Sequence, residues 1–246
     1  MKIYGLIGNP LGHSFSKKYF TEKFSKENLQ DCEYQNFEIK DLRGEIPFIK
    51  ANAEIAGLNV TIPYKSGIIS FLDNITAVCE EINACNCIKV VNGKWTGFNT
   101  DVIGFEKSFI PHLQPHHKKA LVLGTGGSSK AVAYVLDKLN IQFLFVSRNA
   151  ESRDNAITYD AISAKLMEDF TIVINTTPVG MHPNVDRYPQ LPYKFVSNKH
   201  YFFDLIYNPD ETLFLSKAAQ KGATIENGKD MLAIQAEESW KIWNES

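Results

Sequence analysis

Short apolar runs alternate with amphipathic segments along the whole chain. Apolar runs of about four to eight residues between turn residues are typical of strands, and apolar positions three or four apart indicate helices. In the first hundred residues the pattern predicts strands at 2–7, 33–39, 55–61, 85–91 and 94–98, and helices at 16–28, 41–51 and, as short pieces, within 66–82. Further on it predicts a helix at 101–113, strands at 120–123, 142–147, 171–175, 200–205 and 223–226 with helices between them, and a last helix at 230–244.

This alternation predicts an α/β protein with two domains, an N-terminal α/β domain and a doubly wound Rossmann-type domain. The break is expected near residue 100, so that the domains cover 1–100 and 101–228. Residues 111–119 (PHLQPHHKK) are polar and contain two prolines, which predicts a solvated surface connection. Their histidines have no acidic or cysteine partner nearby, so a metal site is the weaker interpretation.

Composition narrows the class of protein. A net charge of −2 and 44% apolar residues do not indicate binding to nucleic acid or to a membrane surface. No segment approaches the roughly 18 apolar residues of a membrane span, and the N-terminus does not have the pattern of a signal peptide. The cysteines form no zinc pattern, and Cys85 and Cys87 suit alternating strand positions. We expect no metal and a cytoplasmic location.

A glycine-rich turn follows the strand at 120–123. Gly124, Gly126 and Gly127 permit a tight turn and a close approach of the backbone to a pyrophosphate, and Ser128 opens the next helix, whose amide groups face the phosphates. The third position of the fingerprint is Ser129, where glycine or alanine is usual. Because a strand precedes the turn and a helix and second strand follow it, the sequence predicts a dinucleotide site.

The second strand of this unit ends in Ser147, Arg148 and Asn149. A site that prefers NAD usually places a carboxylate there to accept from the ribose 2′-hydroxyl. Arg148 instead offers charge-assisted hydrogen bonds to a 2′-phosphate. We therefore predict NADP(H) as the cofactor, the alternative being a surface arginine in a turn. Asn175, Thr176 and Thr177, at the end of the strand at 171–175, are assigned to its ribose and nicotinamide side.

Four polar clusters lie at predicted strand ends in the first domain. Ser14 and Ser16 precede a helix and would serve either as its N-caps or as carboxylate ligands. Asn59 and Thr61 share one face of a strand, and Lys65 follows in a loop. Asn86 comes next, and Asp101 opens a helix as its expected N-cap. Each has a structural explanation alone, but together they suit a polyhydroxylated carboxylic acid.

These residues resemble the shikimate dehydrogenase family. The resemblance rests on Gly8-Asn9-Pro10, His13-Ser14-x-Ser16, Asn59-Val60-Thr61-Ile62-Pro63-x-Lys65, Asn99-Thr100-Asp101-x-x-Gly104, Gly124-x-Gly126-Gly127, Ser147-Arg148, Asn175-x-Thr177, Asp204-x-x-Tyr207 and Gly228…Met231-Leu232…Gln235. The motifs cover nearly the whole chain in order. The resemblance implies reversible NADPH-dependent reduction of 3-dehydroshikimate to shikimate, a step of aromatic amino-acid biosynthesis.

The resemblance also implies the roles of single residues. Lys65 and Asp101 are expected to form the catalytic pair. The expected substrate ligands are Ser14, Ser16, Asn59, Thr61, Asn86, Tyr207 and Gln235. The expected cofactor ligands are Gly124, Gly126, Gly127, Ser128, Ser147, Arg148, Asn149, Asn175, Thr176, Thr177, Leu205 and Gly228. The last helix, 229–246, is expected to return to the first domain, with the active site in the cleft between domains and the protein a monomer or homodimer.

The chemistry fits the lysine. Hydride addition to a ketone creates an alkoxide that needs a proton, and a protonated Lys65 can supply it. Asp101 would orient the amine and hold the reacting hydroxyl.

The chain departs from the family pattern in three places. Cysteines flank Asn86. Family members usually have a second arginine that binds the 2′-phosphate a few residues after the first, and Arg153 matches its position only approximately. The chain also ends soon after Gln235. The alternatives are a quinate/shikimate dehydrogenase with relaxed substrate or cofactor choice, and a non-catalytic NADP-binding regulator.

Overall fold

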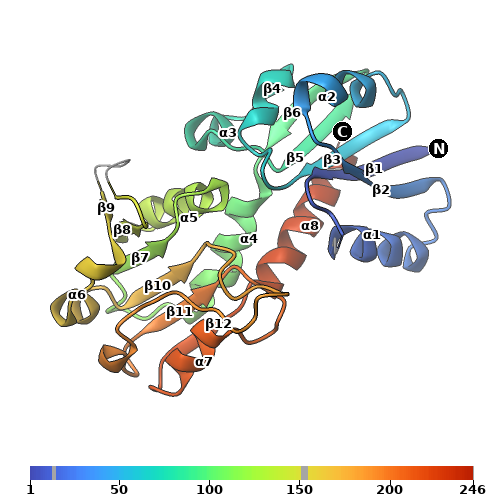
Figure 1. The fold of residues 1–246 in the computed structure, drawn as a ribbon. Helices are drawn as coiled ribbons and strands as arrows, with labels where there is room; N and C mark the ends of the chain where they lie inside the picture. The colour runs from blue at the N-terminus through green and yellow to red at the C-terminus, as the bar shows by residue number, and fades with distance from the viewer. Residues whose placement is uncertain (13–14, 151–154, 246) are drawn as a thin grey trace. The chain divides into compact units, whose positions relative to one another are not determined.

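The computed structural model describes residues 1–12, 15–150 and 155–245, and the chain forms two compact units. Unit 1 comprises residues 1–100 together with 236–246, and unit 2 comprises residues 101–235. Both contain a sheet with helices, so the α/β prediction is confirmed (Figure 1). The chain passes from unit 1 to unit 2 between Thr100 and Asp101, and back within helix α8 (Lys229–Asn244).

The sheet of unit 1 has six strands in the order β2-β1-β3-β5-β6-β4. The strands β1, β2 and β3 are parallel, β5 runs antiparallel to β3 and to β6, and β4 is parallel to β6. Their bounds are Lys2–Gly8 for β1, Cys32–Glu38 for β2, Ile55–Val60 for β3, Asn74–Ile75 for β4, Cys87–Val91 for β5 and Lys94–Phe98 for β6.

Separate apolar clusters cover the two faces of this sheet. One contains Ile46 and Ile49 of α2 (Leu42–Lys50) and Cys79 of α3 (Ala77–Ile82). The other contains Phe20 and Phe24 of α1 (Phe15–Lys26) with Trp243 of α8. Between α2 and β4 lies the short 3₁₀ helix η1 (Gly67–Phe71). Burial on both faces explains the continuous apolar runs in β1 and β3.

Trp243 fixes the end of α8 within unit 1. Its indole Nε1–H donates to the carbonyl of Ile88 at 3.0 Å, and a methyl group at Gly57 would lie 2.4 Å from the indole ring. On the same helix, Glu237 accepts hydrogen bonds from Tyr19 and from Lys23. The end of α8 is therefore part of the unit 1 core.

The sheet of unit 2 is parallel throughout, in the order β12-β11-β10-β7-β8-β9. This is the strand order of a dinucleotide-binding Rossmann fold, in which two halves wind outward from a central pair. The strands are β7 (Lys119–Leu123), β8 (Gln142–Val146), β9 (Ala156–Ile157), β10 (Ile172–Asn175), β11 (Tyr201–Asp204) and β12 (Thr224–Glu226).

Helices cover both faces of the unit 2 sheet. The rings of Phe105 and Phe109 in α4 (Thr100–Phe109) contact Tyr201 and Phe203, whereas Phe202, which points to the opposite face, packs on α7 (Leu213–Ala219). The other α-helices are α5 (Gly127–Lys138) and α6 (Ala164–Asp169), and the 3₁₀ helices are η2 (Ile110–His112), η3 (Tyr159–Ala161) and η4 (Tyr193–Phe195). Among the described residues no helix is both long and apolar enough to cross a membrane.

Three local expectations were wrong. The helix predicted at 101–113 begins at Thr100, so Asp101 lies inside its first turn rather than at the N-cap. Its α-helical part ends at Phe109, because Pro111 cannot donate to the α-helical ladder, and η2 follows. The strand predicted at 85–91 begins at Cys87, since the left-handed Asn83 (φ 47°) ends α3 and redirects the chain.

The segment 111–119 is not a fully solvated loop as predicted. His117 is only 4% exposed. Its Nδ1 accepts a hydrogen bond from the amide of Gln114, and its Nε2 lies 3.1 Å from the carbonyl of Lys199. The segment therefore anchors the start of β7 to the turn before β11.

Candidate active site

The glycine turn after β7 has the geometry that a dinucleotide requires. Gly124 has φ +101°, and a methyl group there would approach the Thr176 Oγ1 and Thr177 Cγ2 atoms within 2.9 Å. Only glycine fits that position without strain. Gly126 is the N-cap of α5, and a methyl group there would meet nothing within 4 Å. The backbone at Gly126 is therefore open to an incoming group.

Ser129, which departs from the usual glycine or alanine, has a structural role. It is fully buried, and its hydroxyl donates to the Gly126 carbonyl at 2.7 Å. This bond closes the first turn of α5 and leaves the amide groups of Gly127 and Ser128 at the helix N-terminus. The backbone amide groups at a helix N-terminus suit a pyrophosphate, so the residues present fit a dinucleotide.

Ser147, Arg148 and Asn149 follow β8 at the same edge of the sheet. The Ser147 hydroxyl accepts from the Asn149 amide at 3.3 Å, and the Arg148 side chain is exposed. Burial raises the pKa of the Tyr159 phenol, and the nearby Arg148 charge opposes that rise. Arg148 is thus close enough to Tyr159 to affect it electrostatically, while Arg153 lies outside the described residues.

The end of β10 forms a hydrogen-bonded turn around Asn175, which is fully buried. Its Oδ1 accepts from the Thr177 amide at 3.1 Å and from the Thr177 hydroxyl at 2.7 Å. The Thr176 hydroxyl donates to the Leu123 carbonyl at 2.6 Å, and the Leu205 amide donates to the Asn175 carbonyl. The structure thus brings together the cofactor residues predicted after β7, β10 and β11.

Gly228 closes this edge of the sheet after β12. Its amide donates to the Ile206 carbonyl at 3.0 Å, and a methyl group there would lie 2.1 Å from the Leu205 carbonyl oxygen. Tyr207 is half-buried beside this contact, and burial raises the pKa of its phenol. A glycine is therefore required at 228 by close packing of two loops.

Asp204 was not predicted as a site residue, although it stands in the quoted motif. It is fully buried at the end of β11. Its Oδ1 accepts from Asn175 Nδ2 and from the Ile206 amide, and its Oδ2 accepts from the Thr212 hydroxyl. Burial raises its pKa to about 7 despite these three donors. The signal that could have identified it is a carboxylate at the end of an apolar strand.

Asp101 and Gln235 are placed on two helices that pack within unit 2. A methyl group at Gly104 of α4 would lie 2.7 Å from the Met231 carbonyl and 3.1 Å from Gln235 Cβ. Asp101 is three residues before Gly104, so both occupy the same face of α4. Asp101 is 5% exposed. Gln235 therefore lies beside the face of α4 that carries Asp101.

A neutral hydrogen-bond network lies at the end of β3 in unit 1. Asn59 Nδ2 donates to the Ser239 hydroxyl at 2.9 Å and to the Asn86 carbonyl at 3.3 Å. Asn86 Oδ1 accepts from the Thr100 amide at 2.6 Å, and its Nδ2 donates to the Thr100 hydroxyl at 3.1 Å. The Thr100 and Ser239 hydroxyls are 3.3 Å apart. Asn59 and Asn86 are thus brought together, as predicted.

Tyr34 completes this network and was missed by the sequence analysis. Its phenol donates to Asn59 Oδ1 at 2.9 Å. Burial raises its pKa well above the usual range, and a hydrogen bond with Ser16 opposes the rise. Ser16 lies inside α1 rather than at its N-cap, and Ser14 lies outside the described residues. An isolated tyrosine in an amphipathic strand carries no local signal of such a role.

The loop that carries Lys65 is held by backbone and side-chain bonds. The Thr61 amide donates to the Ile7 carbonyl, the Cys85 amide donates to the Lys65 carbonyl at 2.7 Å, and the Tyr64 phenol donates to the Ile39 carbonyl at 2.7 Å. Thr61 and Lys65 are both half-buried. These bonds fix the backbone of the loop from which the Lys65 side chain extends.

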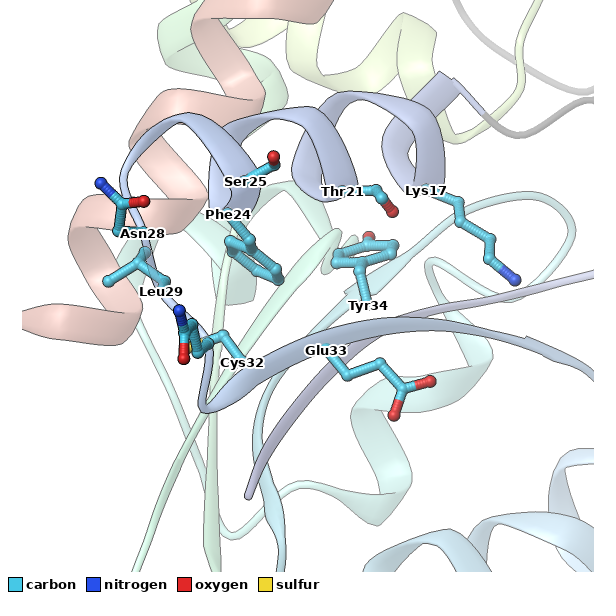
Figure 2. A pocket seen from close by; sticks show the side chains of 10 residues that line it. Lys17, Thr21, Phe24, Ser25, Asn28, Leu29, Cys32, Glu33 and Tyr34 are labelled. Atoms are coloured by element: carbon cyan, nitrogen blue, oxygen red, sulfur yellow. The ribbon is translucent and has the colours of Figure 1, made fainter.

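A hollow of about 510 Å³ lies elsewhere in unit 1, between α1 and β2 (Figure 2). Side chains of α1, among them Lys17, Thr21 and Phe24, line one side, and Glu33 and Tyr34 of β2 line the other. It contains none of the residues predicted to bind the substrate. Tyr34 belongs both to the lining of this hollow and to the Asn59 network, to which its phenol donates.

Comparisons with known proteins agree with these motifs. The sequence profile of the shikimate dehydrogenase substrate binding domain matches residues 6–88. A shikimate dehydrogenase (NADP(+)) of Methanococcus maripaludis is 35% identical over 270 residues, covering 98% of this chain and 91% of that protein.

Solved structures agree as well. A chorismate mutase/shikimate 5-dehydrogenase fusion protein from Clostridium acetobutylicum has a TM-score of 0.88 at 36% identity, covering 99% of this chain and 91% of that one. Shikimate 5-dehydrogenase from Thermus thermophilus, solved in complex with NADP(H) and shikimate, has a TM-score of 0.87 at 26% identity, covering 99% and 94%. The resemblance is confirmed, and the chain belongs to the shikimate dehydrogenase family.

Proposed function

We propose that the protein catalyses the reversible NADPH-dependent reduction of 3-dehydroshikimate to shikimate. The observation that carries the proposal is the set of groups at the carboxyl edge of the unit 2 sheet. There the open Gly126 backbone, the N-terminus of α5 and the Asn175 turn converge as a dinucleotide requires. The relatives named shikimate dehydrogenase support the choice of substrate.

Lys65 and Asp101 are the proposed catalytic pair. Bound NADPH would supply the hydride to the ketone carbon. Lys65 would donate a proton to the ketone oxygen, and in the reverse direction it would accept that proton from the hydroxyl. Asp101, buried in the first turn of α4, would hold the amine and the reacting hydroxyl in place.

Hydroxyl and amide groups would bind the rest of the substrate. Ser14, Ser16 and Thr61 offer hydroxyls, Asn59, Asn86 and Gln235 offer amides, and Tyr207 offers a phenol. Such groups can match a ring that carries hydroxyls and a carboxylate. Because the amides of Asn59 and Asn86 also bond inside the unit 1 network, their orientation would be set before substrate arrives.

Arg148 is the proposed basis of NADP preference. Its exposed guanidinium would bind the 2′-phosphate, with Ser147 and Asn149 beside it. Gly124, Gly126, Gly127 and Ser128 would hold the pyrophosphate, and Asn175, Thr176, Thr177, Leu205 and Gly228 would border the nicotinamide. We also propose that the enzyme acts in aromatic amino-acid biosynthesis in the cytoplasm, where its four free cysteines would stay reduced.

One assay tests the proposal. Purified protein is given shikimate or quinate, each with NADP+ or NAD+, and the absorbance of the reduced cofactor is followed. The fastest turnover is expected with shikimate and NADP+. Faster turnover of quinate would favour the quinate/shikimate alternative, and NADPH binding without any turnover would favour the non-catalytic regulator.

A further inference from the structure

Asp204 is a buried carboxyl group on which two loops of unit 2 converge. Its oxygens accept from Asn175 Nδ2 at 3.0 Å, from the Ile206 amide at 3.0 Å and from the Thr212 hydroxyl at 2.6 Å. Asn175 ends β10, whereas Ile206 and Thr212 belong to the segment that follows β11. One side chain therefore links the turn after β10 to the loop after β11.

On the β10 side, Asp204 determines which way the Asn175 amide faces. Oδ1 of Asp204 accepts from the Ile206 amide as well, so it acts as an acceptor whether the carboxyl group is ionised or carries a proton on Oδ2, and the NH₂ group of Asn175 must point toward it. The Asn175 Oδ1 then faces Thr177, where it accepts from both the amide and the hydroxyl. With the opposite amide orientation, the Thr177 amide would face an NH₂ group and lose its acceptor.

On the β11 side, the same carboxyl fixes the start and the end of a loop. The Ile206 amide is held at the start, and the Ile206 carbonyl accepts from Gly228. Thr212 is held at the end, where its Oγ1 also caps α7 by accepting from the Leu215 amide at 3.4 Å. The loop between them carries Tyr207.

We infer that Asp204 is a positioning residue for the nicotinamide half of the dinucleotide site, acting through Asn175 and Thr212. The inference rests on the proposed function, which assigns the 175–177 turn and Leu205 to that half. Arg148 and the end of β8, which would hold the adenine half, receive none of the three Asp204 hydrogen bonds. Loss of Asp204 should therefore affect one half of the cofactor and spare the other.

The test compares whole NADPH with 2′,5′-ADP, which contains the adenine half alone. Dissociation constants are measured by fluorescence titration for NADPH and by calorimetry for 2′,5′-ADP, so no turnover is needed. Asp204→Ala should weaken NADPH binding about tenfold and change 2′,5′-ADP binding by less than about twofold. Asp204→Asn, whose Oδ1 can still accept from Asn175 and Ile206, should weaken NADPH binding only about threefold.

His200 provides a matched control at the opposite end of β11. It is 3% exposed, its Nδ1 accepts from the Ser197 amide at 3.1 Å, and its Nε2 lies 2.9 Å from the Met167 carbonyl. His200→Gln should lower the melting temperature of the protein while leaving the ratio of the two dissociation constants unchanged. This separates loss of stability from loss of positioning.

If Asp204→Ala weakens the binding of NADPH and of 2′,5′-ADP equally, Asp204 only maintains the fold and the inference is wrong. Unchanged NADPH binding in this variant would also overturn the inference. If Asp204→Ala does not fold, Asp204→Asn and Thr212→Val decide by the same ratio. Wild-type protein that binds neither compound would refute the proposed function itself, and the inference with it.

Discussion

Each unit places a buried polar network where its strands end, and the two networks differ in charge. In unit 1 the network joins Tyr34, Asn59, Asn86, Thr100 and Ser239, all of them neutral. In unit 2 the network centres on the carboxyl group of Asp204. Neutral amides and hydroxyls can both donate and accept, whereas an ionised carboxyl only accepts and therefore dictates the orientation of its partners.

The difference has a consequence for pH. Burial raises the Tyr34 pKa well above its usual range, so the unit 1 network keeps its protons at any pH near neutrality. Asp204, with a pKa of about 7, changes its charge near neutral pH. The unit 1 network should therefore respond to mutation but not to pH, and the unit 2 network should respond to both.

The largest effect is expected at Lys65, which belongs to unit 1 but not to its network. Lys65→Ala should lower kcat by more than about a hundredfold with a smaller change in KM, since general acid–base help contributes roughly 10²–10⁴-fold. Steady-state kinetics with shikimate and NADP+ measures this. Lys94→Ala, an exposed lysine on β6, should leave kcat unchanged. An unchanged kcat in Lys65→Ala would remove the proposed role.

A pH-dependent loss of stability is the next effect in size. Between pH 4 and pH 7 folded Asp204 keeps a proton that the unfolded chain, with a pKa of 3.8, has released. The free energy of unfolding should therefore fall as pH rises through this window, by at most about 4 kcal/mol. Urea denaturation at a series of pH values, compared with Asp204→Asn, isolates this contribution, because the variant has no carboxyl to titrate.

The comparison with Asp204→Asn is needed because other groups titrate in the same range. Burial lowers the pKa of His117 and of His200. Their contribution to the free energy of unfolding therefore decreases as pH falls below the ordinary histidine pKa of 6.5. Tyr193, whose pKa is raised by burial and by nearby charges that include Asp204, stays protonated throughout. A wild-type profile parallel to that of the variant would mean that Asp204 does not titrate in this window.

The unit 1 network should show a smaller effect that does not vary with pH. Tyr34→Phe removes the donor to Asn59 Oδ1 in a buried site, so the free energy of unfolding should fall by about 1–3 kcal/mol at pH 5 and pH 8 alike. Tyr64→Phe, which breaks a partly buried hydrogen bond to the Ile39 carbonyl, should lower the free energy of unfolding by about 0.5–1.5 kcal/mol. A Tyr34→Phe loss that changes between the two pH values would contradict the neutral character of the network.

Local patterns predicted the parts of both sites that depend on neighbouring residues. The strand, glycine turn and helix at 119–138 form one continuous signal, and so do the motifs around Asn59 and Lys65. The two-residue strands β4 and β9 were missed because so short a segment has no periodicity.

The networks could not be predicted because their members are far apart in the sequence. Asn59 and Ser239 are 180 residues apart, and Asn175 and Asp204 meet only because β10 and β11 pair in that register. His117 was misjudged for the same reason, since its partner Lys199 is 82 residues away. Composition alone made that segment look solvated.

The smallest effect is expected at Arg148, the exposed charge of unit 2, and it sharpens the contrast with buried Asp204. Arg148→Ala should lower kcat/KM for NADP+ about tenfold and leave kcat/KM for NAD+ unchanged, because only the former has a 2′-phosphate for the guanidinium to bind. The wild-type preference should shrink as salt is raised, since exposed charges are screened. The effect of Asp204→Ala on NADPH binding, relayed through buried hydrogen bonds, should persist in salt. Similar kcat/KM values for both cofactors in the wild type would mean that Arg148 is a surface arginine, and that a single guanidinium does not select NADP here.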